Sequence, residues 1–207
     1  MNRNACWAAH QGAAWKVTAL LAEGVNPNGN DARGRTPLMF AAAGGHTECV
    51  RLLITAGADP MRRATYGHAP RRTALEIAIE YGRLECVGAL LDAGVPINGT
   101  WRVGRSALET AVRFGREDIL RCLLARGADP NQRAFGLWGL RAFRLTPLHW
   151  AVSFRRELMI ADLIAHGANP LATVMTVAGP VSPIRMARRR RHTSIVEILQ
   201  RGLPRRV

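Results

Sequence analysis

The sequence has 207 residues, 48% of them hydrophobic, which is enough apolar material for the core of one domain or of a short repeat array. It carries 29 Lys and Arg residues against 15 Asp and Glu residues, a formal net charge of +14. The sequence has no run of about 18 apolar residues and no apolar secretory signal at its N-terminus, so we expect a cytoplasmic protein and no membrane association.

A short motif recurs along the chain: Thr or Ser, then Pro or Ala, then Leu or Ile, then an Ala-containing pair. Thr or Ser before Pro is typical of a helix N-cap with proline in the first turn, so each copy predicts the start of a short helix. The N-terminal copy is degenerate and contains Cys6-Trp7-Ala8-Ala9. The other copies lie at residues 36–42, 73–79, 106–112, 146–152 and 182–187.

Each copy continues into a second apolar stretch and then a glycine turn. Leu52, Leu53 and Ile54 supply the apolar face of one predicted second helix, and Gly57 follows it. Glycine at that place favours a left-handed residue that ends the helix. One such helix pair cannot bury its own apolar face, so neighbouring copies are expected to stack.

These residues resemble the ankyrin repeat, whose pattern includes Thr-Pro-Leu-His-x-Ala and a later Gly-Ala-Asp. The resemblance covers nearly the whole chain and implies an all-α repeat solenoid: helix-turn-helix repeats with β-hairpin fingers, some of them extended. It implies a single domain over 1–207 with six copies, of which the first and last are degenerate caps. The approximate copies are 1–33, 34–70, 71–103, 104–143, 144–179 and 180–207.

The spacing of the glycine turns is uneven. From Gly24 to Gly202 the intervals are 33, 37, 33, 40 and 35 residues, against an ankyrin period of about 33. The added residues fall after a glycine turn and before the next helix cap, which is where the resemblance places the fingers. Additions to surface loops cost little stability and often carry function.

The longest predicted finger, residues 131–145, places apolar side chains between arginines. Exposed, these side chains would contact a partner or a lipid surface; folded back, they would cover the groove or a neighbouring finger. Two earlier fingers are interpreted in the same way, with a solvated hairpin as the alternative. The finger residues predicted to bind a partner are Tyr66, Trp101, Phe135, Leu137, Trp138, Arg141 and Phe143.

In ankyrin families the fingers and the exposed side of the first helices form a concave recognition surface. Carried over by motif, Tyr81, Phe114 and Phe154 occupy one repeated position and are predicted to line up as an aromatic strip, although they could instead pack between repeats. Arg113 also belongs to this predicted surface. So do Arg189 and Arg190, which lie in a run of four arginines that could instead be a solvated cap.

The charge is concentrated in the C-terminal third, where residues 131–207 hold 13 cations and three acids. Such asymmetry is typical of a face that meets an acidic partner, nucleic acid or an anionic membrane. The sequence therefore predicts a non-enzymatic protein-protein interaction module or adaptor whose groove and long fingers bind an acidic protein. The alternative is nucleic-acid binding through the arginine-rich C-terminal third, with a nuclear location if the source is eukaryotic.

No motif for catalysis stands out, and no metal, cofactor or small-molecule substrate is expected. His149 matches a place where the ankyrin pattern itself uses histidine, and Glu76 and Glu109 occupy the same place in other copies. One departure from the pattern is Arg155, which replaces the glycine expected after the first helix. We expect it to distort that turn, because glycine suits a left-handed residue there.

Overall fold

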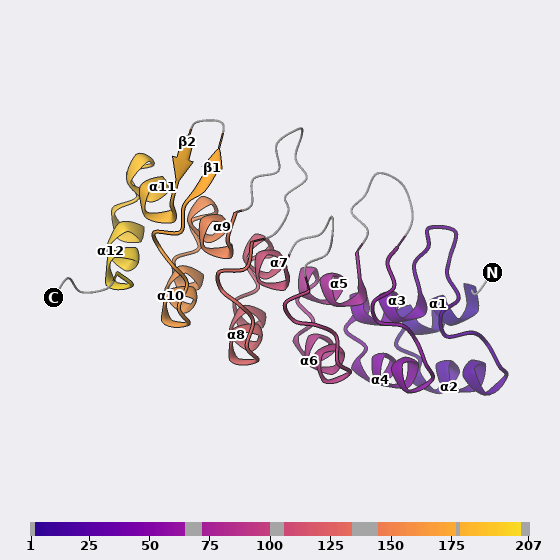
Figure 1. Ribbon diagram of the computed structural model, residues 1–207. Helices are drawn as coiled ribbons and strands as arrows, with labels where there is room; N and C mark the ends of the chain where they lie inside the picture. Colours follow the sequence, from indigo (N-terminus) through magenta and orange to yellow (C-terminus); the bar gives the residue numbers. More distant parts are fainter. Residues whose placement is uncertain (1–2, 65–71, 100–105, 134–144, 177–178, 204–207) are drawn as a thin grey trace. The chain divides into compact units, whose positions relative to one another are not determined.

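The computed structural model describes residues 3–64, 72–99, 106–133, 145–176 and 179–203 (Figure 1). The chain divides into two compact units, Met1–Pro96 and Ile97–Val207, and each is described by itself. The prediction of one continuous domain therefore stays a prediction. Along the described residues, no helix combines the length and the apolar character needed to cross a membrane.

The described residues of the first unit form a stack of three helix pairs. Within it, the first helices α1, α3 and α5 pack side by side, and the second helices α2, α4 and α6 form another layer (Figure 1). The bounds are α1 Arg3–His10, α2 Ala14–Ala22, α3 Pro37–Gly44, α4 Thr47–Thr55, α5 Ala74–Glu80 and α6 Leu84–Asp92.

The second unit repeats this arrangement, with α7, α9 and α11 in one layer and α8, α10 and α12 in the other. Its helices are α7 Ala107–Phe114, α8 Glu117–Ala125, α9 Pro147–Ser153, α10 Glu157–Ala165, α11 Pro183–Arg189 and α12 Thr193–Arg201. A short antiparallel hairpin precedes α11, formed by β1 (Val174–Thr176) and β2 (Gly179–Val181) with Val174 opposite Val181 (Figure 1). The predicted all-α repeat solenoid is confirmed, and this hairpin is a finger of the predicted kind.

The first helices begin where the recurring Thr or Ser predicts. Thr36 accepts a hydrogen bond from the Met39 backbone N–H at 3.3 Å, and Ser106 accepts one from the Glu109 N–H at 3.0 Å. At Thr73 the bond is reciprocal, because the Glu76 carboxylate also accepts from the Thr73 N–H at 2.8 Å. These caps satisfy backbone donors that the first turn of a helix leaves unpaired, which fixes where each copy starts.

The core of each unit lies between its two helix layers. The alanine pairs of the first helices are fully buried, as at Ala41 and Ala111, so neighbouring first helices can approach closely. The second helices add fully buried leucines such as Leu53 and Leu163. Burying one leucine contributes roughly 1.5–3 kcal/mol, and no single copy could bury these faces alone.

Asparagine side chains join consecutive copies at the base of the fingers. Asn98 donates through Nδ2 to the Gly127 carbonyl at 3.2 Å, and its Oδ1 accepts from the Asp129 N–H at 2.8 Å. Asn131 makes the same pair of bonds to Gly167 and Asn169. In the first unit Asn28 bonds to Gly57 and Asp59 in this way. The amide thus ties each of these glycine turns to the copy before it.

Candidate functional site

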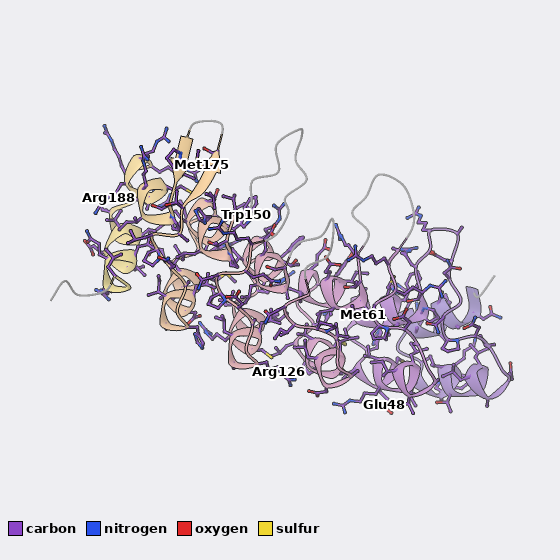
Figure 2. All side chains as sticks on the ribbon, in the orientation of Figure 1. Glu48, Met61, Arg126, Trp150, Met175 and Arg188 are labelled. Carbon is purple, nitrogen blue, oxygen red and sulfur yellow. The ribbon has the colours of Figure 1, made fainter. Side chains whose placement is uncertain are left out.

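The candidate site lies at the C-terminal ends of α7 and α9, in the second unit. The guanidinium carbon of Arg113 lies 5.2 Å from the ring centroid of Trp150 and 5.8 Å from that of Phe154. The two rings are stacked, with centroids 5.7 Å apart and planes at 16°. Trp150, which Figure 2 labels, is half-buried, and 39% of Phe154 is exposed, so the stack is partly open to solvent.

The helix period explains this cluster. Trp150 and Phe154 are four residues apart, so they lie on the same side of α9 and its end. Arg113 is at the corresponding end of α7, which packs directly against α9. A cation over an aromatic face is attracted by the ring quadrupole, so Arg113 holds the stack in place while Arg113 itself stays half-buried.

Arg190 extends the site toward α11. Its Nη1 donates to the Ser153 carbonyl at 3.2 Å and to the Ser153 hydroxyl at 3.3 Å. Ser153 is the residue before Phe154, so the two hydrogen bonds hold an exposed guanidinium next to the aromatic stack. Arg189, the last residue of α11, is also exposed.

Charges in the second unit are separated between the two helix layers. The first helices α7, α9 and α11 contain one acid, Glu109, which is 2% exposed. The second helices hold the exposed or half-buried acids, and Arg121 on α8 is already paired with Asp162 on α10 at 2.9 Å. The first-helix face of the described second unit is therefore cationic, and the second-helix face is mixed. The acids of the second helices are Glu117, Asp118, Glu157, Asp162 and Glu197.

The structure brings together only part of the predicted site. Arg113, Phe154 and Arg190 join one continuous cluster in the second unit, and Phe114 is half-buried beside Arg113 in the chain. Tyr81 is 53% exposed at the end of α5, in the first unit, so the predicted three-ring strip stays a prediction. The predicted finger residues lie outside the described residues; they are Tyr66, Trp101, Phe135, Leu137, Trp138, Arg141 and Phe143.

Trp150 is the site residue that sequence reasoning missed. It lies inside the Thr-Pro-Leu-His-Trp-Ala motif. This motif predicts the helix cap and the buried core residues, but it assigns no role to the position that Trp150 occupies. The spacing of Trp150 and Phe154 was the available signal, because residues four apart on a helix are neighbours. The equivalent residue of the first unit, Phe40, is also an aromatic beneath a guanidinium, with Arg35 4.5 Å from its ring centroid.

The expectation that Arg155 distorts its turn is wrong. Arg155 adopts the left-handed conformation itself, with φ +56°, close to the φ +64° of Gly115. Its N–H donates to Val152 at 3.2 Å, which matches the bond from Gly115 to Val112. The hydrogen bonds that close the turn on both sides hold the residue in place, although the left-handed conformation costs a residue with a Cβ about 1–2 kcal/mol.

His149 is fully buried in the capping position of α9. Its Nδ1 lies 2.8 Å from the Thr146 hydroxyl and 3.3 Å from the Thr146 nitrogen, whose N–H needs an acceptor. The ring proton therefore belongs on Nε2, which faces the Val181 carbonyl at 3.4 Å. Burial, and secondarily the charge of Arg133, lower the pKa of His149 to about 4, while the Val181 hydrogen bond acts in the opposite direction.

Glu76 holds the same position in the first unit, where it accepts from the backbone and hydroxyl of Thr73. Burial raises the pKa of the Glu76 carboxyl against these hydrogen bonds. Both groups are thus used within their own copies as helix caps. In the described ranges, no three His, Cys, Asp or Glu side chains are grouped so that they could hold a metal ion.

The family model of ankyrin repeats in three copies matches residues 5–100 and 67–134, and that of a single ankyrin repeat matches residues 144–173. The chain is similar to two solved ankyrin repeat domains. That of Bcl-3, described as a unique member of the IkappaB protein family, is 29% identical with a TM-score of 0.81, over 97% of this chain and 86% of that one. The human ASB11 domain is 25% identical with a TM-score of 0.74, over 97% and 83%.

Curated relatives are much longer than the part that matches. The Ankyrin repeat and KH domain-containing protein mask-1 of Caenorhabditis elegans is 36% identical over 132 residues, 63% of this chain and 5% of that protein. The E3 ubiquitin-protein ligase KEG of Arabidopsis thaliana is 28% identical over 201 residues, 93% of this chain and 12% of the ligase. The fold is typical of non-enzymatic interaction domains. The repeated motif, the helix pairs and these matches all lead to one assignment, and the chain belongs to the ankyrin-repeat family.

Proposed function

We propose that this chain is a protein-binding adaptor whose second unit binds an acidic protein partner through its first-helix face. Ankyrin repeats mediate the binding of protein partners. The observation that carries the finer proposal is the Arg113–Trp150–Phe154 cluster, in which the partly exposed ring of Phe154 lies on a helix layer whose described first helices carry several arginines and no exposed acid.

The stacked rings supply affinity, and the arginines supply steering and orientation. Aromatic and arginine side chains are prominent among the residues that dominate binding energies at interfaces. Aromatic rings do so because they bury a large area at a modest cost in conformational entropy. Arg113 and the Arg190–Ser153 contact hold the rings and one guanidinium in place before a partner arrives, which lowers the entropy lost on binding. The cationic face attracts an acidic partner electrostatically, and the range of this attraction decreases as the salt concentration rises.

The apolar finger belongs to the same proposal on sequence grounds. Trp138 and Phe143 lie in the segment that leads from the glycine turn at Gly127 into α9. A pure backbone-binding site for nucleic acid has no need of such apolar residues, whereas a protein interface does. The partner we propose is a protein met in the cytoplasm.

The test is affinity capture from a cytosolic lysate, with and without nuclease, using matched baits. The site variant is Trp150→Ala/Phe154→Ala, and Phe154→Ala alone serves as a milder variant because this ring is more exposed. The control is Leu158→Ala, which removes an equally apolar side chain, 60% exposed, from the second-helix layer. A second site variant, Trp138→Ala/Phe143→Ala, tests the finger.

We expect wild type and Leu158→Ala to retain the same acidic protein after nuclease treatment, and Phe154→Ala to lose most of it. Circular dichroism checks that each bait is folded. If the Phe154 and Trp150 variants retain the partner as wild type does, the proposed site is wrong. If nuclease empties every bait, the arginine-rich C-terminal third binds nucleic acid instead.

A further inference from the structure

One backbone position recurs in every copy, at the turn between the first and the second helix. It has a left-handed conformation throughout, with φ from +55° to +83°. Glycine fills it in the first four copies, and arginine fills it in the last two. The residues are Gly12, Gly45, Gly82, Gly115, Arg155 and Arg191.

The fold does not require arginine at this position. Arg191 donates its N–H to Arg188 at 3.1 Å, and Arg155 donates to Val152 at 3.2 Å, which are the bonds that Gly115 makes in the same unit. Glycine takes this conformation without strain, whereas a residue with a Cβ loses stability there. A strained residue held in place by its surroundings points to a function for its side chain.

The surroundings of both arginines are cationic and accessible. Arg155 and Arg191 are exposed, and each is next to a further exposed arginine in the chain, Arg156 and Arg190. In the described part of the chain, neither Arg155 nor Arg191 forms an ion pair with a carboxylate. Glu157, the acid nearest to Arg155 in the chain, accepts a hydrogen bond from Ser194 at 2.6 Å. These guanidinium groups are available to an external anion.

We infer that Arg155 and Arg191, together with Arg190, bind carboxylates of an acidic peptide segment that crosses the turns of the last two copies. This rests on the proposed function and names the part of the partner that is bound. Guanidinium groups bind carboxylates through paired, charge-assisted hydrogen bonds, which a lysine cannot reproduce. Arg190 is already oriented by Ser153, beside the exposed ring of Phe154.

The stacking of the copies sets a spacing for the peptide. Helices α9 and α11 pack against each other, and packed helices lie about 8–10 Å apart. A polyproline II chain has three residues per turn and rises about 3.1 Å per residue, so every third side chain points the same way, about 9 Å apart. Successive copies therefore face every third residue of such a peptide. A segment with acids at positions i and i+3 therefore fits Arg155 and Arg191 together.

The aromatic cluster favours a peptide over a nucleic acid. Proteins that bind single strands offer free ring faces on which bases stack. Here Trp150 and Phe154 stack on each other, and Arg113 lies over both rings. One face of each ring is therefore engaged within the protein, while the exposed part of Phe154 stays open to an apolar side chain of a peptide.

The experiment measures binding of a fluorescent peptide with Glu at every third position, by anisotropy, to the full chain. The main variant is Arg155→Gly/Arg191→Gly, which keeps the turn in the form that other copies use. We expect its affinity for the peptide to fall tenfold or more, while its Tm rises by about 2 °C or more. Arg155→Lys/Arg191→Lys keeps the charge and is expected to restore only part of the affinity.

Two controls define the outcomes. The peptide with Gln in place of Glu should not bind wild type, and an oligothymidylate reports nucleic-acid binding. Unchanged peptide affinity in the glycine variant overturns the inference, and so does a wild type that binds only the oligonucleotide. If the lysate partner is lost by Phe154→Ala but kept by the glycine variant, the proposed function stands and this inference fails; if both variants keep it, the proposed function itself fails.

Discussion

The two units fold the same repeat with different residues at the turn inside each helix pair. In the first unit this turn is Gly12, Gly45 and Gly82, and the residue that precedes the second helix of the next copy lies against the turn at Gly12 and at Gly45. His46, for example, donates through its Nε2–H to the His10 carbonyl at 3.0 Å, and its ring lies against Gly12. In the second unit only the first of the three turns is glycine.

This difference shows that the left-handed turn of the repeat keeps its backbone conformation whether glycine or arginine occupies it. Arg155 has nearly the same φ and the same closing hydrogen bonds as Gly115. The fold thus explains the left-handed turn but not the arginine. Because the first-helix layer of the second unit also lacks an exposed acid among its described residues, the arginines add to one cationic face rather than to internal ion pairs.

The largest expected difference between the units concerns pH and His149. Below pH 6.5 the unfolded histidine takes up a proton that the folded one, with its pKa lowered to about 4, does not accept. The free energy of unfolding should therefore fall as the pH falls from 6.5 toward 4, by at most about 3 kcal/mol at roughly 1.4 kcal/mol per pKa unit. Denaturant titrations at several pH values measure this loss.

His149→Gln is the matched variant, because glutamine keeps a side-chain acceptor at the third position of the helix. The first unit supplies the contrast. In its second copy Met39 occupies the same place and does not titrate. In its third copy burial raises the pKa of Glu76, so the contribution of Glu76 to the free energy of unfolding is present at low pH and is lost as the pH rises past its folded pKa. An acid-induced loss that is equally large in His149→Gln would assign it to other groups.

The next effect concerns Gly45, in the turn of the first unit. Gly45→Arg should lower the free energy of unfolding by about 2 kcal/mol, because φ is +83° and a Cβ would lie 2.9 Å from Cδ of Arg83. Arg83 would then have to give up its 3.0 Å hydrogen bond from Nε to the Ala43 carbonyl. Urea unfolding monitored by circular dichroism measures the loss.

Gly45→Ala is the control for this substitution, since it adds the Cβ without the guanidinium and should account for most of the loss. If Gly45→Arg is as stable as wild type, then the turns of the first unit tolerate arginine too. In that case the left-handed arginines of the second unit carry no sign of function.

Sequence reasoning succeeds here where the signal is local. Thr36, Thr73 and Ser106 cap helices because a hydroxyl and an N–H three residues on are enough to define the start. The glycine turns also follow the prediction through Gly167, whereas Gly202 has φ −85° and is not left-handed.

The candidate site was only partly predictable, because its contacts join different copies. Arg113 and Phe154 were found from their repeated position, but the partner that joins them, Trp150, depends on how α7 packs on α9. The conformation of Arg155 depends on hydrogen bonds on both sides of the turn, which a preference for glycine does not reveal.

The smallest expected effect tests the asparagine links between copies. Asn98→Ala in the second unit and Asn28→Ala in the first should each cost about 1 kcal/mol, since each amide makes two hydrogen bonds at partly exposed sites. The equivalent residue after the next turn of the first unit is Met61, and the residue that it faces in the following copy is Pro96, which has no N–H to donate.

Met61→Asn should therefore leave the free energy of unfolding nearly unchanged, although it restores the consensus of the other copies. The sequence shows the same pairing at the C-terminus, where Leu171 replaces the asparagine and Pro204 follows Gly202. Thermal unfolding of the three variants decides the point. A gain near 1 kcal/mol in the free energy of unfolding of Met61→Asn would mean that one hydrogen bond, from the new amide to the Gly94 carbonyl, is enough to link the two copies. The second bond, from a backbone N–H at the position of Pro96, would then be dispensable.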